Sequence, residues 1–214
     1  VISIVFFWIY QSFSFVGMIG IGLSAWIISN VLVTFLQQLG VNYKNKKITN
    51  DNIPKYSLSM VLAHLGMGLL IIGITGSSVW QKEKIIKMNI NSETKIHEYN
   101  IVLNEINKIQ GPNYFALRGK FSVYNNKKKI ITVLNPENRY YPVTNITTTE
   151  ASIDVNLSRD LYIVLGEGNT NEGWIVRIYY NPLVVWIWIG ASTIFMGGLI
   201  SIKNNLKFIK YSTV

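Results

Sequence analysis

The sequence contains no cysteine, so disulfides, thiolate catalysis and cysteine-ligated metals are excluded for this chain. It also lacks a glycine-rich phosphate loop, an HExxH or GxSxG motif and any paired-carboxylate signature, so its motifs establish no reaction. Histidine is scarce, because only His64 and His97 occur among 214 residues. Acidic residues are also few, with 11 Asp and Glu against 20 Lys and Arg. Any chemistry therefore rests on a small number of polar side chains.

The formal net charge of +9 does not indicate a nucleic-acid partner. No basic helix and no RNA-binding signature accompanies it. Much of the positive charge lies instead beside long apolar runs, where lysine reports membrane topology.

Three apolar runs are long enough to cross a bilayer as helices, at residues 13–39, 57–80 and 182–202. We therefore predict a transmembrane region at residues 1–80, an outer domain at 81–181, and a last span with a basic tail at 182–214. Glycines near the start of the first run and Gly66 and Gly73 in the second would permit close helix packing.

Lysines predict which side of the membrane each loop occupies. The short loop 40–55 carries four lysines against Asp51 alone, and the tail carries Lys203, Lys207 and Lys210. By the positive-inside rule both belong on the cytoplasmic or matrix side, which leaves residues 81–181 facing the periplasm or intermembrane space. Three tryptophans, Trp80, Trp186 and Trp188, fall near that outer boundary, where amphipathic rings are favoured.

The outer segment has strand-like patterns. Apolar and polar residues alternate in residues 96–106, 113–125 and 174–182, and Ile153, Val155 and Leu157 alternate before a second apolar run. The NNKKK stretch predicts a turn, and GEGNTNEG predicts a hairpin loop. Short strands at this spacing favour an antiparallel β domain. The expected fold class is thus an α-helical membrane bundle with an extramembrane, mainly antiparallel β domain.

His64 is the one histidine in a membrane-length run and lies seven residues, roughly 10 Å, along it. Such a group is costly in lipid and usually faces a bundle interior or a site. Three interpretations stay open: a hydrogen bond to a neighbouring helix, ligation of a haem or metal, and a proton or ion path. Gly68, one turn along, would let a flat macrocycle approach. Three methionines are candidate thioether ligands or core fillers: Met18, Met67 and Met196.

Two arginines of the outer domain are further candidates. Arg139 and Arg177 could bind carboxylates bidentately near a membrane surface, including haem propionates. Ordinary ion pairs with Glu137, Asp154 or Asp160 are the alternative. His97, beside Glu98, is expected to be an exposed loop or strand histidine.

Four stretches together are similar to the C-terminal part of the CcmF family, the haem lyase of system I cytochrome c maturation. They are MVLAHLGMGLLIIGITGS at residues 60–77, PENRYYPV at 136–143, TTTEASI at 147–153, and the segment from RDLYIVLGEG to the end of the last span at 159–201. Their order and spacing hold over about 150 residues.

This resemblance implies a specific role for His64. Members of the family sit in the bacterial or mitochondrial inner membrane, take haem from the chaperone CcmE and join it to the thiols of apocytochrome c. They also hold a b haem within the membrane, and His64 matches the C-terminal histidine ligand of that haem. The resemblance further implies contact with a CcmH-type companion subunit.

The family's tryptophan-rich WWD motif and its flanking histidines are absent. The resemblance therefore implies that the partner ligand and the WWD motif belong to an N-terminal part, and that this chain alone is inactive. It would be one piece of a split protein or a truncated C-terminal portion, and nitrite-reductase-type paralogues would look similar here.

Two other functions remain as alternatives: a non-enzymatic membrane assembly scaffold, and a fragment of a His-dependent transporter. A proton-relay transporter would be expected to pair His64 with intramembrane acids. The three predicted spans contain no Asp or Glu, which counts against it.

Overall fold

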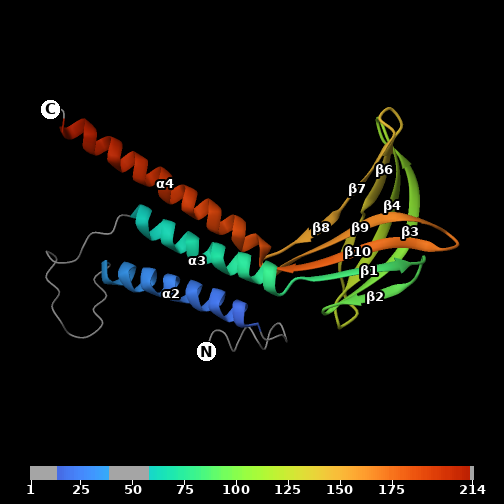
Figure 1. Ribbon diagram of the computed structural model, residues 1–214, viewed down its shortest axis with the longest axis horizontal. Helices are drawn as coiled ribbons and strands as arrows, with labels where there is room; N and C mark the ends of the chain where they lie inside the picture. Colours follow the sequence, from blue (N-terminus) through green and yellow to red (C-terminus); the bar gives the residue numbers. More distant parts are fainter. Residues whose placement is uncertain (1–13, 39–57, 213–214) are drawn as a thin grey trace. The chain divides into compact units, whose positions relative to one another are not determined.

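A computed structural model describes residues 14–38 and 58–212 of the chain (Figure 1). The chain divides into two compact units, Val1–Trp80 with Leu183–Val214, and Gln81–Pro182. The lysine-rich loop 40–55 lies outside the described residues, as do the side chains of Lys207 and Lys210.

Three helices of the first unit are long and apolar enough to cross a membrane, as predicted. They are α2 (Phe15–Gln38), α3 (Leu58–Val79) and α4 (Val184–Ser212). The last helix differs from the prediction at both ends. It begins at Val184 because the strand β10 runs to Pro182, and it continues beyond residue 202 through the segment expected to be a tail.

Small residues hold α3 against both of its neighbours. Towards α4, a Cβ at Gly66 would lie 2.7 Å from the carbonyl oxygen of Gly190, so the two backbones touch. Gly73 likewise packs against Ile187. This confirms the prediction that Gly66 and Gly73 serve helix packing, because only residues without a large side chain allow such an approach.

The contact between α2 and α3 uses Gly68, which changes the role expected for it. A Cβ at Gly68 would lie 2.5 Å from Ile28 of α2, and the Ser24 hydroxyl donates a 2.8 Å hydrogen bond to the Gly68 carbonyl. Gly68 is therefore covered by α2, so a macrocycle has no open surface to approach there. Trp80, expected as an interfacial anchor, is buried and lies against Gly17.

The second unit is an antiparallel β domain, as predicted. Its strands are β1 (Lys82–Met88), β2 (Glu93–Ile96), β3 (Tyr99–Gln110), β4 (Phe115–Tyr124), β5 (Ile130–Leu134), β6 (Glu137–Tyr141), β7 (Ile146–Glu150), β8 (Ser152–Val155), β9 (Arg159–Asn169) and β10 (Gly173–Pro182). One sheet has the order β1-β10-β9-β8 and the other β2-β3-β4-β6-β7, with β5 also paired to β4.

Alternate residues of both sheets form the core of the β domain. Ile101 of β3, Phe121 of β4, Ile163 of β9 and Ile178 of β10 are completely buried. The chain passes from one sheet to the other at Ala151, because β7 pairs with β6 and the next strand, β8, pairs with β9.

Local strand predictions were right in type and less accurate in extent. The predicted strand from Ile96 is interrupted by a turn at His97, whose φ of 50° is left-handed, so β2 ends and β3 begins there. The NNKKK turn is present between β4 and β5. The GEGNTNEG hairpin is also present, although its first four residues continue β9.

Arg159 joins the two sheets from within the core. Its side chain is almost completely buried, and Nε donates to the Tyr99 hydroxyl at 3.2 Å across the sheets. Its Nη1 donates to the carbonyl oxygen of Asp154 at 2.9 Å and forms an ion pair with the Asp154 carboxylate. The guanidinium also lies over the Tyr99 ring, 4.8 Å from its centroid. Because each polar contact is made to a fixed group, the buried charge is well compensated.

We predict that Gly190→Ala destabilises the helical unit by about 1–3 kcal/mol, because the new methyl would lie 2.5 Å from the Leu70 amide nitrogen. Gly198→Ala on the same helix is the matched control. A Cβ there meets no atom of the described residues within 4 Å, so helix propensity should make it neutral or slightly stabilising. Thermal unfolding of the full chain in detergent, followed by circular dichroism, compares them. Equal effects would contradict the packing described.

We also predict that Arg159→Ala lowers the stability of the β domain by about 3 kcal/mol, because it leaves the partly buried Asp154 carboxylate without its partner. Arg177→Ala, at an exposed site on β10, should change stability by less than about 0.5 kcal/mol. Hydrogen exchange of the Leu161 and Ile163 amides in the full chain measures the stability of the β domain in both variants. An Arg159 variant as stable as the Arg177 variant would be the contrary result.

Candidate functional site around His64

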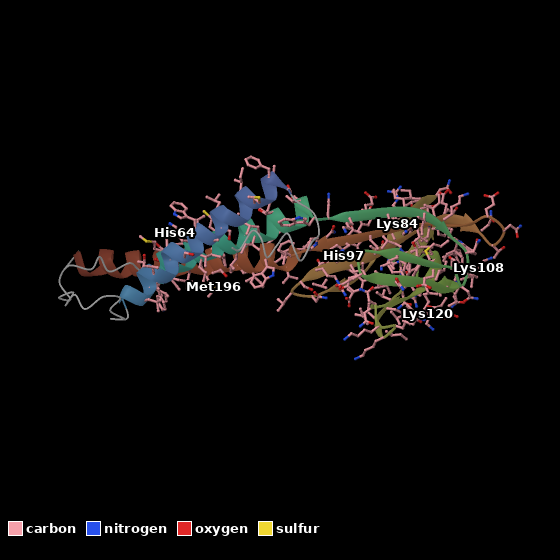
Figure 2. The ribbon with its side chains drawn as sticks, turned by 90° about the horizontal axis from the view of Figure 1, so that it is seen from below. His64, Lys84, His97, Lys108, Lys120 and Met196 are labelled. Carbon is pink, nitrogen blue, oxygen red and sulfur yellow. The ribbon has the colours of Figure 1, made fainter. Side chains whose placement is uncertain are left out.

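His64 lies six residues after the start of α3, on an exposed part of that helix (Figure 2). Beside it is a groove of about 270 Å³ between α2 and α3, lined by Asn30, Val31, Thr34, Met60, Val61 and His64. The imidazole is therefore accessible from outside the three helices that the structure describes.

A backbone hydrogen bond fixes which imidazole nitrogen is free to act as a ligand. Nδ1 of His64 lies 2.9 Å from the Met60 carbonyl oxygen. A carbonyl can only accept, so Nδ1 carries the proton and donates. In the neutral ring Nε2 is then the atom with the lone pair. Histidine ligands of metals commonly donate their other N–H in this way, which sets the tautomer and ring orientation.

The polar residues of α2 in the groove are occupied within their own helix. The Asn30 side-chain amide donates to the Trp26 carbonyl at 2.7 Å, and the Thr34 hydroxyl donates to the Asn30 carbonyl at 2.8 Å. The bond to Met60 also stays within α3, so the hydrogen bond described for His64 does not join it to α2 or α4.

No second ligand from this chain accompanies His64 in the described residues. Met60 is the one methionine that lines the groove, and Met18, Met67 and Met196 are exposed elsewhere on the helices. Within residues 14–36 and 58–203, no three His, Asp or Glu side chains converge as a metal site. A metal group at His64 would need its other axial ligand from outside these helices.

His97 lies far along the sequence in the turn between β2 and β3. Its Nδ1 accepts from the Lys82 ammonium at 3.3 Å, and its ring packs against Tyr180 with centroids 4.6 Å apart. Burial and the positive charge of Lys82 lower the pKa of His97, so the ring is neutral at pH 7. His97 was expected to be exposed, but the structure places it in a partly buried turn, where its ring packs against Tyr180.

Arg139 is held in an ion-pair cluster. Its Nε donates to Glu137 at 2.8 Å, Glu150 lies 3.7 Å from Nη1, and the guanidinium stacks 4.5 Å from the Tyr114 ring centroid. Arg118 donates to the other Glu137 oxygen at 2.7 Å. Burial raises the pKa of Glu137, but the hydrogen bonds from Arg139 and Arg118 outweigh it, so the pKa is lowered overall. The ion pair with Glu137, one alternative for Arg139, is present.

Arg177 is in a different environment, on the exposed face of β10. Its neighbours across the sheet are Ile85 of β1 and Val164 of β9. Tyr179, two residues along, stacks on Tyr162 with centroids 4.5 Å apart. A hydrogen bond with Glu83 and burial raise the pKa of Tyr179, whereas its hydrogen bond with Arg177 acts in the opposite direction. Among the described residues, neither Asp154 nor Asp160 forms an ion pair with Arg177, and the Asp154 carboxylate pairs with Arg159 instead.

Arg159 is a structural residue that was not predicted from the sequence, although a signal for it was present. Arg159 lies two residues before Leu161 in the strand. It therefore belongs to the same face as Leu161, Ile163 and Leu165, which are all buried. A charged residue at an inward position of a strand predicts a buried partner.

A family model described as "CcmF C-terminal beta-sandwich" matches residues 79–182. The cytochrome c-type biogenesis protein CcmF of Escherichia coli K12 is 33% identical over 201 residues, which cover 94% of this chain and 30% of that protein. The CcmF of Pseudomonas aeruginosa PAO1 is 32% identical, with 89% of this chain and 29% of that protein covered.

A solved structure titled "Cytochrome c Heme Lyase CcmF" resembles the chain with a TM-score of 0.65 at 15% sequence identity. The similarity covers 88% of this chain and 31% of that one, and it establishes the fold. The chain thus spans about a third of the length of the relatives it matches.

The ion pairs of Glu137 with Arg118 and Arg139, here called the Glu137 cluster, predict how the stability of the β domain depends on pH. Because the pKa of Glu137 is lowered on folding, the unfolded chain binds its proton more readily. The cluster should therefore stabilise the β domain above the ordinary glutamate pKa and lose this contribution as the pH falls through the folded value. Denaturant unfolding of the full chain between pH 7 and pH 3 should show a smaller acid dependence in Glu137→Gln. An unchanged acid dependence in that variant would refute the assignment.

Proposed function

The chain belongs to the CcmF family of cytochrome c-type biogenesis proteins, as its C-terminal part, and we propose that it supplies His64 as one axial ligand of a membrane b haem. In this proposal it is the C-terminal subunit or fragment of a haem lyase, and it requires an N-terminal part for activity. That part would carry the WWD motif and the second axial ligand.

The observation that carries the proposal is the hydrogen bond from His64 Nδ1 to the Met60 carbonyl. It leaves Nε2 as the basic nitrogen of a ring that is exposed on an apolar helix. An imidazole in that position gains most by ligating a metal or by pairing with a polar group from another segment. The groove also suits an apolar group, because Val31 and Val61 line it and the Asn30 amide and Thr34 hydroxyl donate to carbonyls of their own helix.

A haem bound here would supply one-electron redox chemistry. The chain's own contribution would be to orient one ligand nitrogen, because the Nδ1 bond to the Met60 carbonyl fixes the ring and leaves the lone pair of the neutral imidazole on Nε2. Close packing of α3 would hold that nitrogen at a fixed position, because the helix is packed backbone to backbone on α4 and is held to α2 by the Ile28 and Ser24 side chains at Gly68.

The β domain is proposed as part of the dock for the haem chaperone CcmE, apocytochrome c and a CcmH-type companion subunit. Arg177 is the better candidate for a partner contact, because it is exposed among apolar neighbours. Arg139 is engaged by Glu137 and Glu150, so it would contribute mainly by shaping the surface.

The proposed location is a bacterial or mitochondrial inner membrane, crossed several times, with the β domain in the periplasm or intermembrane space. Three membrane-capable helices and the lysines of loop 40–55 support this orientation. The alternatives are a non-enzymatic assembly scaffold and a fragment of a His-dependent transporter. A scaffold would form the same complex without a haem spectrum.

We expect the complex of this chain with its N-terminal partner to show a low-spin b-type spectrum that His64→Gly abolishes. Adding imidazole should restore the spectrum, because a free imidazole can enter the space left by the side chain. His97→Gly is the matched control and should retain the spectrum, since His97 packs in the β domain. Visible absorption of the purified complex is the measurement. If His64→Gly keeps a full spectrum while its partner still co-purifies, the proposed ligand is wrong.

A further inference from the structure

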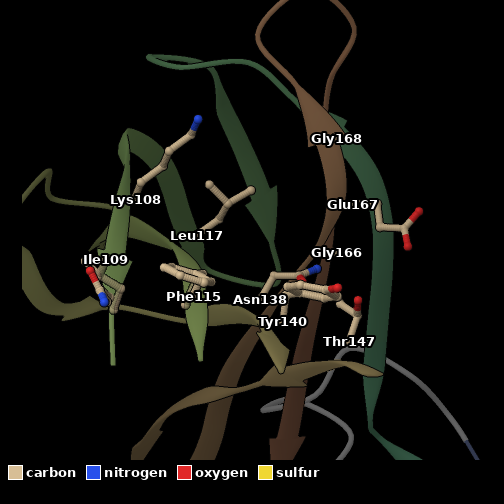
Figure 3. A pocket seen from close by; sticks show the side chains of 12 residues that line it. Lys108, Ile109, Phe115, Leu117, Asn138, Tyr140, Thr147, Gly166, Glu167 and Gly168 are labelled. Atoms are coloured by element: carbon tan, nitrogen blue, oxygen red, sulfur yellow. The ribbon is translucent and has the colours of Figure 1, made fainter. Parts of the chain in front are cut away.

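The β domain contains an open groove of about 730 Å³ that is separate from the His64 site (Figure 3). Strands of both sheets line it. Phe115 and Leu117 of β4, Asn138 and Tyr140 of β6 and Thr147 of β7 belong to one sheet, and residues 166–168 of β9 belong to the other.

The groove exists because β9 lacks a strand partner along part of one edge. The strand β8 pairs only with Asp160, Leu161, Tyr162 and Ile163. Beyond these residues, in the described part of the domain, β9 is paired through Asn169 on its β10 side alone. Since β7 belongs to the other sheet before the crossing at Ala151, no strand is laddered to β9 there, and the Asn138 side-chain amide of β6 donates to the Leu165 carbonyl at 3.5 Å. Alternate residues of such an edge direct N–H and C=O groups into the unpaired space.

The side chains of the groove are apolar or neutral at its centre. Phe115 is 52% exposed and Tyr140 is 41% exposed, although both lie beside the core of the domain. The uncharged polar lining consists of two side-chain amides, Gln110 and Asn138, and two hydroxyls, Tyr140 and Thr147. The charged residues Lys108 and Glu167 lie on opposite sides (Figure 3). The guanidinium groups of Arg118 and Arg139 belong to the other face of β4 and β6, because their strand neighbours Leu117 and Asn138 line the groove.

We propose that this groove binds a short extended polypeptide segment, which adds as a strand beside residues 164–169 of β9. Its main chain would pair with the edge of β9 that carries no strand, replacing the long hydrogen bond that Asn138 donates to the Leu165 carbonyl. Its alternate side chains, apolar or small and uncharged, would pack on Phe115 and Tyr140. An unpaired strand edge favours this occupant over a small apolar molecule, which offers no complementary row of donors and acceptors. The lining carries one cation, Lys108, and one anion, Glu167, so it offers no net positive charge to an anionic ligand.

The identity of the polypeptide rests on the proposed function. A haem-free cytochrome is an unfolded chain whose backbone groups are unpaired, so it can offer an extended segment without first breaking its own sheet. Capture beside β9 would hold that chain at the β domain.

The test uses the full chain with its N-terminal partner in nanodiscs and reduced, haem-free cytochrome c as the probe. Thr147→Arg places a long charged side chain in the groove at an exposed position of β7. Thr144→Arg is the matched control, because Thr144 is exposed in the turn of the same hairpin and does not line the groove. Thr147→Arg should weaken probe binding by about tenfold or more, and Thr144→Arg should leave it unchanged.

Hydrogen exchange identifies the mode of binding. The probe should slow exchange of the amides in residues 164–169, and Thr147→Arg should remove this protection. Unchanged affinity in Thr147→Arg, or a bound probe that does not protect this segment, would overturn the inference. If haem alone slowed exchange of residues 164–169 equally, the groove would be a small-molecule site and the polypeptide proposal would be wrong. The haem spectrum of the complex should be the same in both variants, so failure here is distinguishable from failure of the His64 assignment.

Discussion

The close contact of α3 with α2 and α4 at its glycines is the constraint on which the helical unit depends. Gly66 and Gly73 bring α3 onto α4, and Gly68 brings it onto α2. Both contacts leave His64 exposed beside a groove, with its described hydrogen bond directed to its own helix. The imidazole is therefore not needed to hold these three helices together. This removes one interpretation of an intramembrane histidine within this chain and strengthens the case for a ligand from outside it.

The β domain depends on a second constraint, the passage of the chain from one sheet to the other between β7 and β8. Arg159 closes the core at the end of β9 that β8 covers, where it reaches Tyr99 of the opposite sheet. At the other end of β9 no equivalent strand is present in the described residues, and the apolar interior opens as a groove. One strand crossing thus produces both a tightly closed end and an open one.

The sequence was sufficient to predict the three spans and the antiparallel strands, because hydrophobic length and alternation are local signals. It did not predict which face of α3 packs on which helix, since a helix that is apolar all round carries no periodic signal. Gly68 was therefore assigned to a ligand surface although Ile28 covers it. The contacts of buried Arg159 and the groove of the β domain were not predicted for a related reason. Both depend on which strands pair across the domain, and alternation within one strand contains no such information.

The central claim is that Nε2 of His64 ligates a haem iron, and isotope labelling of this chain alone tests it most directly. Because the sequence has only two histidines, ¹⁵N-histidine labelling in a His97→Gln background leaves His64 as the sole label. The labelled chain is combined with an unlabelled N-terminal partner, and pulsed electron paramagnetic resonance is recorded on the ferric complex. The account predicts one strongly coupled ¹⁵N nucleus on the low-spin iron. A low-spin haem without any ¹⁵N coupling would contradict it.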